Sequence, residues 1–520
     1  MAEEKKDKKI RILFHSDSPR CSTGFGKIIW GMCNYLVKTG KYEIDIFGVN
    51  DLGFLDPDPE KYPYRILPAM IPGIQGDFYG RIRFINIIRG ADRNFLTPPW
   101  DIIFTLNDPF IFEEPVLTPE IGMMDALKDL QGLYKKDLAP EAWFKIVSYW
   151  PVDSNLKENW ISHAIGYPDY SVAYTNYGKS EIEKANNKLP KPLKFNLDVI
   201  YHGTDTKSFH PISKEEKLEF KKKFFRKAKI DIERTYIVGI VARNQMRKDI
   251  PRAMKIFKEF QKRRPDSMLY IHAKENDVWG SLGEYARNFN LELGKDWIFP
   301  GNFNENVGYP TEALNKIYNI MDVQIQTTLG EGWGNCISEA MSAGTLNLAP
   351  NITSIPELFN TVGKDIEAGS DIEIEEIRGI PLKAHSTTSE WATYGPTDYE
   401  RLRPLTNVDD AVKKLLWVYD NPDKAKIIAD RAREWIQQYD WQNIGKKWDE
   451  FFQKVYNGLE KERLEGKKEI KKEEDPPTHE ASADAEALAD RSEGQENDDA
   501  KSIPTAESDS ATAESDSVAA

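Results

Sequence analysis

Short apolar runs alternate with helical patterns along most of the chain, and these runs predict twelve strands. The first half holds six of them, at residues 10–16, 42–49, 101–106, 144–150, 170–175 and 198–203. The second half holds the other six, at residues 235–242, 267–273, 297–301, 322–327, 345–350 and 379–384. Most of these runs are apolar throughout, which is typical of strands buried on both faces of a parallel sheet.

The strand–helix repetition predicts an α/β protein with two doubly wound, Rossmann-like domains that face a cleft. Open sheets of this kind bind ligands at the carboxyl ends of their strands, so functional residues are expected in loops that follow strands. We divide the chain into a charged extension, two Rossmann-like domains, a C-terminal helix and an acidic tail, at residues 1–9, 10–204, 205–440, 441–470 and 471–520.

Amphipathic patterns follow the second set of strands, at residues 407–420, 422–438 and 441–465. They carry four tryptophans and two phenylalanines, namely Trp417, Trp435, Trp441, Trp448, Phe451 and Phe452. A helical cap that packs through these aromatics is the simplest interpretation.

The end of the chain differs sharply from the rest in composition. Residues 473–520 hold fifteen Asp or Glu and two Lys or Arg, and the hexapeptide at 505–510 recurs at 512–517. Since the net charge of the whole chain is −14, the remaining residues are close to neutral. A segment with so few large apolar residues cannot offset its chain entropy by burial, so a disordered acidic tail is predicted.

The whole chain has 40% hydrophobic and 11% aromatic residues, which is typical of a globular protein. Cys21, Cys33 and Cys336 form no CxxC pair and suit a reducing compartment. No signal peptide or transmembrane stretch is evident, so a cytoplasmic protein is expected. Basic patches at 219–228 and 243–248 allow transient contact with an anionic membrane surface, and nothing indicates a nucleic-acid partner.

The stretch GEGWGNCISEA, residues 330–340, follows a predicted strand and opens a predicted helix at 336–343. Asn335 is expected to cap the start of this helix, and Gly344 to end it. The glycines let the backbone approach a ligand, and the helix start offers unpaired N–H groups to an anion. Taken alone, the stretch fits a ligand site and a glycine-rich turn with an exposed glutamate equally well.

Two further loops also follow predicted strands. Arg243 and Lys248 lie five residues apart after the strand at 235–242, where two cations can neutralise a pyrophosphate. A solvated basic loop is the alternative, because Arg247 makes this region basic in any case. After the first strand, Gly24-Phe25-Gly26 opens a helix, which suits contact with phosphate or sugar. The third glycine of a dinucleotide-binding fingerprint is missing there, and the chain has no P-loop sequence.

In combination, these features resemble the nucleotide-sugar half of retaining GT-B glycosyltransferases, the family 4 group. The resemblance covers about residues 235–350 and the hinge before them, and it rests on four motifs in the family's order. They are R-x4-K at Arg243 and Lys248, E-x7-E at Glu331 and Glu339, EAM-x-x-G at Glu339 to Gly344, and G-x-D-x3-F-x-P at Gly203, Asp205, Phe209 and Pro211. The N-terminal half resembles the family mainly in its opening loop.

The resemblance implies a metal-independent enzyme, without a cofactor, that transfers a sugar from a nucleoside diphosphate sugar with retention of configuration. Residues 10–204 would form the acceptor-side domain and residues 205–440 the nucleotide-sugar domain. The sugar, the base and the acceptor are left open, and a glycan, a lipid, a protein or a small molecule could each accept the sugar.

The family's site residues are carried over by role. Arg243 and Lys248 would hold the diphosphate and stabilise the charge that develops on it. Glu331 would accept hydrogen bonds from the transferred sugar, and Glu339 from the ribose. Backbone amides would complete the anion site at Gly24, Phe25 and Gly26 and at Gly332, Trp333, Gly334 and Asn335.

The chain departs from the family pattern in four places. Its opening loop reads STGFG and lacks the family's adjacent glycines, and after the strand at 345–350 the family's glycine pair is replaced by NITSIPE, although Glu357 keeps its place. The segment that matches the family's catalytic histidine, residues 148–155, reads SYWPVDSN and has no histidine. Asp153 is the nearest ionisable group, and it either orients the acceptor or the sugar, or caps a helix. Residues 385–406 look like an added loop that either faces the acceptor or plays no part in the site. The DPDP sequence at 56–59 is interpreted as a turn rather than a metal-binding pair, because prolines flank its carboxylates.

Two other activities of this fold are disfavoured. A phosphorylase would need a lysine motif for pyridoxal phosphate, and an epimerase would lack the E-x7-E element in this form. A GT-B protein without turnover, which binds a sugar nucleotide or a partner and displays its acidic tail, stays open because the histidine is missing.

Overall fold

The computed structural model describes residues 8–474 apart from several segments. These segments are residues 52, 54–57, 71–76, 92–97, 114, 119–120, 227, 229–230, 278–279, 302–307, 365–375, 385–390 and 393–400. Nearly all of the predicted acidic tail therefore lies outside the described residues, as do most of the N-terminal extension, half of the DPDP sequence and most of the added loop. Those predictions, like the exact domain boundaries, stay predictions.

The first sheet has seven parallel strands in the order β3-β2-β1-β4-β7-β8-β9. The strands are β1 Ile10–Asp17, β2 Tyr42–Val49, β3 Arg65–Pro68, β4 Ile102–Leu106, β7 Lys145–Trp150, β8 Tyr170–Ala173 and β9 Asn196–Val199. Six of them match predicted runs. The prediction missed β3 because this strand is four residues long and lies at the sheet edge, where it is only partly buried.

The second sheet has six parallel strands in the order β14-β11-β10-β15-β16-β17. They are β10 Tyr236–Val241, β11 Ser267–His272, β14 Trp297–Ile298, β15 Val323–Ile325, β16 Asn347–Pro350 and β17 Ile380–Leu382. Three short antiparallel pairs lie outside both sheets, namely β5 Pro115–Thr118 with β6 Ile121–Gly122, β12 Asn276–Asp277 with β13 Gly280–Ser281, and β18 Trp391–Ala392 with β19 Arg403–Pro404. The prediction of two Rossmann-like sheets is confirmed.

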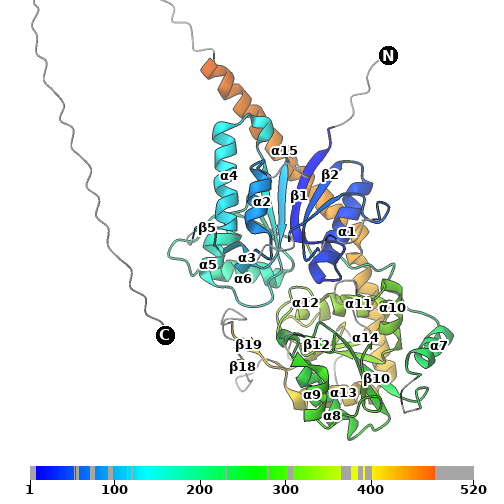
Figure 1. Ribbon diagram of the computed structural model, residues 1–520. Helices are drawn as coiled ribbons and strands as arrows, with labels where there is room; N and C mark the ends of the chain where they lie inside the picture. The colour runs from blue at the N-terminus through cyan, green and yellow to red at the C-terminus, as the bar shows by residue number, and fades with distance from the viewer. Residues whose placement is uncertain are drawn as a thin grey trace, which may run out of the picture. The chain divides into compact units, whose positions relative to one another are not determined.

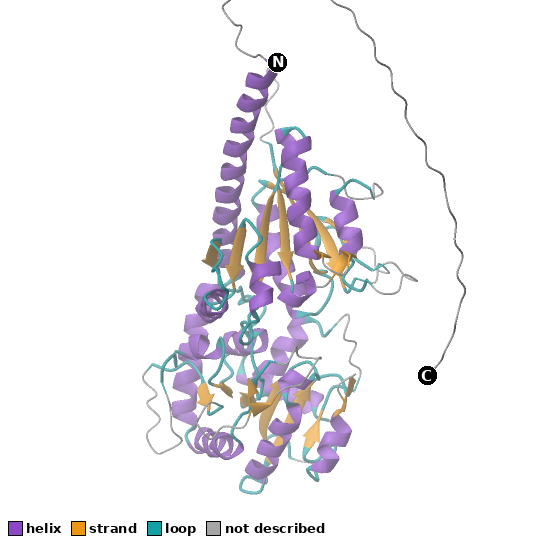
Figure 2. Ribbon diagram, turned by 90° about the vertical axis from the view of Figure 1, so that its left-hand side faces the viewer, coloured by secondary structure: helices purple, strands orange, loops and turns teal. Residues whose placement is uncertain are grey.

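Helices cover both faces of each sheet (Figure 2). Successive side chains of β1 point to opposite faces, so Ile12 packs in the core beneath α1 (Gly24–Lys38), whereas Leu13 packs with α2 (Arg81–Ile88) and α4 (Met123–Asp137). We call this sheet with its helices the first lobe.

The second sheet is built in the same way. Ile240 of β10 packs with α8 (Ile250–Gln261), whereas Ile237 packs with α10 (Thr311–Ile320). We call this sheet with its helices the second lobe. The other helices in the two lobes are α3 Pro109–Glu113, α5 Glu158–Trp160, α6 Asn176–Asn186, α7 Lys214–Phe224, α9 Leu282–Asn288, α11 Asn335–Ala343 and α12 Ile355–Phe359.

Three helices end the described chain, α13 Val408–Asp420, α14 Pro422–Ile436 and α15 Trp441–Glu474. The long helix α15 returns to the first lobe and lies beside its sheet (Figure 1). The ring of Trp448 stands edge-on to that of Phe104, with centroids 5.5 Å apart, and the Tyr42 hydroxyl donates to Asp449 at 2.6 Å. The aromatics of this helix therefore pack as predicted, but against β-strands of the first lobe.

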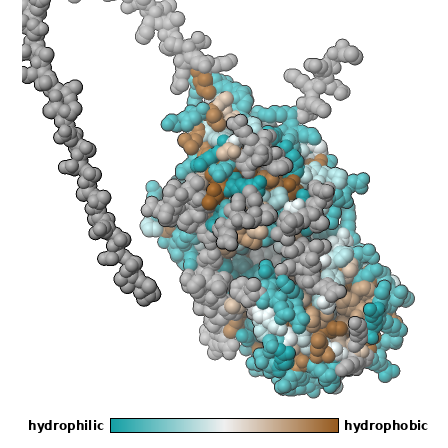
Figure 3. Space-filling model, viewed as in Figure 1, coloured by the Kyte–Doolittle hydropathy of each residue, from teal (hydrophilic) through white to brown (hydrophobic). Residues whose placement is uncertain are grey.

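The described residues up to 468 belong to one compact unit, and every contact discussed below lies within it. Hydrophilic residues predominate on the described part of the face in Figure 3. Among the residues that the structure describes, no helix is long and apolar enough to cross a membrane.

Candidate functional site

A cavity of about 850 Å³ is lined by loops from both lobes. Its walls include the segments that follow β1, β4 and β7 in the first lobe and β10 and β15 in the second. These are the carboxyl ends of the strands, where open parallel sheets bind their ligands.

The structure brings nearly all of the predicted site residues to this cavity. Those that line it are Gly24, Phe25, Asp153, Arg243, Lys248, Glu331, Gly332, Trp333, Gly334, Asn335 and Glu339. Gly26 is the exception. Its N–H donates to the Thr23 hydroxyl at 3.1 Å and so caps α1, and an added Cβ would lie 2.6 Å from the Cys21 carbonyl oxygen. Gly26 therefore serves local packing.

The glycines of the loop at 330–334 allow a close approach between the two lobes. A Cβ on Gly330 would overlap the carbonyl oxygen of Asp153, and one on Gly332 would lie 3.1–3.3 Å from the backbone of Pro151. Gly334 has a φ of +96° and is itself the N-cap of α11, so the prediction that Asn335 caps this helix is wrong. Gly344, with a φ of +82°, ends the helix as expected.

Trp333 contributes packing rather than an exposed ring. It is 2% exposed, and its indole lies parallel to the imidazole of His202, with the ring centroids 6.0 Å apart. His202 lies in the predicted strand at 198–203, directly before the hinge motif, and also lines the cavity. Burial lowers the pKa of His202 to about 3, so its ring is neutral at physiological pH. The sequence analysis did not single out this histidine.

Glu331 is held between two cations. Its carboxylate pairs with the Lys248 ammonium and lies 3.4 Å from the Arg247 guanidinium. Burial disfavours the ionised form, but the two cations outweigh it and hold the pKa of Glu331 below its usual value. Glu331 is therefore a permanent hydrogen-bond acceptor at the cavity wall.

Glu339 is 4% exposed and lies one turn into α11. Lys27 of α1 donates to one of its oxygens at 2.6 Å, and the Tyr318 hydroxyl donates to the other at 2.7 Å. Lys27 crosses from the first lobe to reach this carboxylate. The prediction missed Lys27, although its place one turn after Gly24 puts it on the same part of α1.

Arg243 differs from Lys248 in its surroundings. Its side chain is 61% exposed, and its Nε lies 3.3 Å from an Asp277 carboxylate oxygen. The two cations of the R-x4-K motif therefore share a cavity, but they are paired with different carboxylates.

Asp153 lies at the centre of an arginine cluster. Its carboxylate is within 3.3 Å of Arg247, 3.1 Å of Arg401 and 3.3 Å of Arg403. Burial disfavours its charge, but the three guanidinium groups hold the pKa of Asp153 well below its usual range. The alternative that Asp153 caps a helix is wrong, because α5 begins at Glu158 after Lys157.

The cluster contains three arginines that sequence reasoning missed. Arg247 was assigned to a generally basic loop, yet it bridges Glu331 and Asp153 and donates to the Gly330 carbonyl. Arg401 and Arg403 lie about 250 residues from Asp153 in the sequence, so no motif spacing could connect them. Arg403 is fully buried.

Another contact joins the lobes through Glu357. Glu357 of α12 accepts hydrogen bonds from the backbone N–H of Tyr177 at 2.6 Å and from the Tyr201 hydroxyl at 2.5 Å. The carboxylate thus stabilises the start of α6, where helix N–H groups have no partner within the helix.

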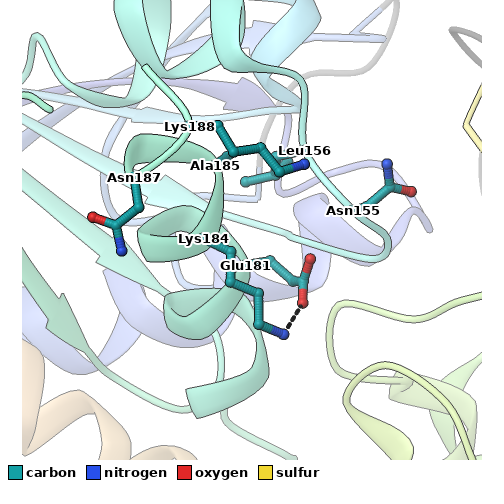
Figure 4. Close-up of a pocket in the computed structure, with 7 residues that line it drawn as sticks. All are labelled: Asn155, Leu156, Glu181, Lys184, Ala185, Asn187 and Lys188. Atoms are coloured by element: carbon teal, nitrogen blue, oxygen red, sulfur yellow. Dashed lines mark hydrogen bonds and ion pairs between the residues drawn. The ribbon is translucent and has the colours of Figure 1, made fainter. Parts of the chain in front are cut away.

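A smaller cavity of about 340 Å³ lies between α6 and the loop after β7 (Figure 4). Lys184 donates to Glu181, one turn earlier on α6, at 2.7 Å, and Leu156 and Ala185 provide apolar walls. None of the predicted site residues lines it. The described residues contain no group of three or more His, Cys, Asp or Glu arranged to hold a metal ion.

No family model matches the sequence, and no curated protein matches it. Solved structures do match the fold over 86% of this chain. They include sucrose-phosphate synthase from Thermosynechococcus elongatus, at 14% identity with a TM-score of 0.59 over 100% of its chain. A glycosyltransferase from Rickettsia africae matches at 14% identity with a TM-score of 0.57 over 99% of its chain. HepE from Anabaena, solved with UDP and glucose, matches at 13% identity with a TM-score of 0.54 over 100% of its chain.

These structural neighbours are GT-B glycosyltransferases, and the chain has their fold. At identities this low, the likeness defines the architecture of two Rossmann-like lobes around a cleft.

Proposed function

We propose that this protein is a glycosyltransferase that moves a sugar from a nucleoside diphosphate sugar to an acceptor hydroxyl. We further propose that the enzyme is of the family 4 type, that it retains the configuration of the transferred sugar, and that it needs no metal ion. The observation that carries it is the meeting of Lys248, Glu331 and Glu339 with the loop at Gly24 around one cavity of a GT-B fold. A structural neighbour, HepE, was solved with UDP and glucose, which supports this class of donor.

The diphosphate is assigned to Arg243 and Lys248. Arg243 is exposed enough to turn from Asp277 to a phosphate, and Lys248 is fixed at the cavity wall by Glu331. Backbone amides of Gly24 and Phe25 and the start of α11 add hydrogen-bond donors. Together they stabilise the negative charge that grows on the diphosphate as its bond to the sugar breaks.

The two glutamates take different parts of the donor. Glu331 stays ionised between Lys248 and Arg247, which suits it to accept hydrogen bonds from hydroxyls of the transferred sugar. Glu339 takes the ribose hydroxyls. Its carboxylate oxygens already accept from Lys27 and Tyr318, and each oxygen has a second lone pair for a ribose hydroxyl.

Asp153 takes the place of the family histidine without replacing its chemistry. A carboxylate that three arginines keep ionised is a poor proton acceptor, so we assign Asp153 to positioning the arginines. The proton of the acceptor hydroxyl would pass to the departing diphosphate oxygen as the new glycosidic bond forms.

The test is turnover with a panel of UDP-, GDP- and ADP-sugars, followed as release of the nucleoside diphosphate. The proposal expects release from at least one donor and its loss in the R243A/K248A double variant. Calorimetric binding of a donor without any release would favour the alternative, a GT-B protein that binds sugar nucleotides without turnover.

A further inference from the structure

One carboxylate on the first-lobe wall of the cavity has no protein partner. Asp108 follows β4 and lines the cavity, where it is partly buried. The Ile111 N–H donates to the backbone carbonyl of Asp108, so the side chain does not cap the short helix α3. Within the described part of the chain, no hydrogen bond or ion pair holds the Asp108 carboxylate. This carboxylate is therefore available to a ligand.

Two buried rings line the same cavity and carry further polar atoms of this kind. Tyr174 follows β8, and its ring stands edge-on to that of His202, with the centroids 5.9 Å apart. Neither the Tyr174 hydroxyl nor His202 Nε2 has a hydrogen-bond partner among the residues that the structure describes. His202 Nδ1 donates to the Gly203 carbonyl and the ring is neutral, so its Nε2 is a hydrogen-bond acceptor.

Electrostatic neighbours place Asp108 beside the position of the transferred sugar. Burial and the charge of Asp153 raise the pKa of Asp108 to about 6, and nearby arginines, Arg247 among them, oppose this shift. The carboxylate is therefore mostly ionised at pH 7. Arg247 also contacts Glu331, and the charge of Asp108 in turn raises the pKa of Tyr174. The unpartnered groups thus continue the site from Glu331 into the first lobe.

The three groups together define the chemistry of a matching ligand. A carboxylate and an imidazole nitrogen of this kind only accept hydrogen bonds, whereas the Tyr174 hydroxyl both donates and accepts. A ligand that satisfies them carries several donors, as a polyhydroxylated molecule does. A phosphate or a carboxylate would be repelled by Asp108, and an alkyl chain would leave all three groups unpaired.

We propose that Asp108 and Tyr174 bind hydroxyl groups of the acceptor, and that the acceptor is an uncharged sugar. The inference rests on the proposed function, which places the transferred sugar at Glu331, and it narrows the class of acceptor. His202 Nε2 completes the set as a further acceptor of hydrogen bonds. Ordered water could satisfy the same three groups, so the experiment separates water from a sugar.

The experiment measures transfer by the full chain from whichever UDP-, GDP- or ADP-sugar it turns over. The probes are a panel of uncharged mono- and oligosaccharides, glucose 6-phosphate, a polyprenyl phosphate in phosphatidylcholine vesicles, and a peptide with serine and threonine. Mass spectrometry identifies the product, and release of the nucleoside diphosphate gives the rate. The variants are D108N, Y174F and the control D137N, since Asp137 lies exposed at the end of α4 and does not line the cavity.

The proposal expects at least one uncharged saccharide to be glycosylated. D108N should raise the KM for this acceptor by about tenfold or more, and Y174F by about threefold, because each removes one hydrogen bond to it. Calorimetry should find the nucleotide affinity of both variants within about twofold of the wild type, and D137N should leave the acceptor KM unchanged. Removing the hydroxyl that Asp108 binds should weaken binding to the wild type but not to D108N, as deoxy forms of the accepted sugar would show. A purely structural role of Asp108 would not produce this coupling.

Three results would overturn the inference. Transfer only to glucose 6-phosphate, the polyprenyl phosphate or the peptide would show that the acceptor is not an uncharged sugar. Hydrolysis of the donor that no uncharged saccharide accelerates would have the same meaning. An unchanged acceptor KM in both D108N and Y174F would show that these groups hold only water. Failure to turn over any donor would instead contradict the proposed function itself.

Discussion

The two walls of the cavity are built in different ways. The second lobe supplies Lys248, Glu331 and Glu339 from segments less than a hundred residues apart, each placed by the strand or helix that precedes or carries it. The first lobe supplies Asp153 and Lys27, and both become part of the site through partners from the other lobe. One wall is defined by local sequence, and the other by tertiary contacts.

This difference shows which part of a site a sequence can reveal. Glu331 and Glu339 belong to one strand–loop–helix unit, whose local geometry follows from neighbouring residues. Asp153 instead acquires its surroundings from Arg247, Arg401 and Arg403, which reach it from distant segments.

The largest expected effect comes from removing Lys248. K248M should lower kcat/KM by a factor on the order of several hundred, which corresponds to an activation free energy about 3–4 kcal/mol higher. The reason is that the variant removes a cation that faces the charge developing on the diphosphate. The variant also removes the positive charge that pairs with the buried Glu331 carboxylate. The double variant K248M/E331Q should therefore recover thermal stability but not activity, as melting temperatures and donor turnover would show. Recovered activity in the double variant would mean that Lys248 only neutralises Glu331.

The next effect separates the two glutamates. E339Q should weaken binding of the free nucleoside diphosphate by about tenfold or more, because the ribose loses a charged acceptor. E331Q should leave that affinity nearly unchanged but reduce turnover of the sugar donor by a similar factor. Calorimetry with the nucleotide and kinetics with the nucleotide sugar provide the measurements. Equal loss of nucleotide affinity in both variants would contradict the assignment of Glu331 to the sugar.

A smaller effect tests how closely the two walls meet. G330A should lower the free energy of unfolding by about 1–3 kcal/mol, because the added methyl group would overlap the Asp153 carbonyl and the backbone has a φ of +154°. Its control is G132A in α4, where an added Cβ meets no neighbouring atom within 4 Å and Ala favours the helix. Equal stability of G330A and the wild type in denaturant titrations would show that the lobes are not held together at this loop.

The smallest effect concerns Asp108, whose pKa is raised from 3.8 to about 6 by burial and by Asp153. The folded state therefore keeps this proton more strongly than the unfolded chain, and the wild type loses stability as the pH rises from about 4 to 6. D108N cannot lose stability in this way, so its free energy of unfolding should equal that of the wild type near pH 4 and exceed it by about 1 kcal/mol at pH 7. The difference is kept this small because Asp108 is only partly buried. Denaturant titrations at both pH values check the sign, and a less stable variant at pH 7 would contradict it.

The fold could be predicted largely because its strands are continuous apolar runs. The predicted limits of β2 at 42–49 agree with the structure, and the short edge strand β3 was missed because it buries too little to leave a pattern. The site residues of the second lobe could be predicted equally well, because Glu331 and Glu339 lie in one loop and the helix that follows it. The prediction of Asn335 as the N-cap of α11 failed, because Gly334 takes that position with a φ of +96°.

The cavity wall that the first lobe supplies could not be predicted in the same way. Asp153 was noticed as an ionisable group, but its three arginine partners come from two distant segments of the other lobe. Lys27 carries no signal in the sequence, because its partner Glu339 lies 312 residues away. A single sequence contains no spacing that relates such residues, and their meaning arises only from the folded arrangement.

The most direct test of the account is a crystal structure of the protein soaked with a nucleotide sugar. The account predicts the diphosphate within hydrogen-bond distance of Lys248 and Arg243, the ribose at Glu339 and the sugar at Glu331, between the two walls. A nucleotide bound outside this cavity, or one bound in it with the ribose away from Glu339, would contradict the central claim.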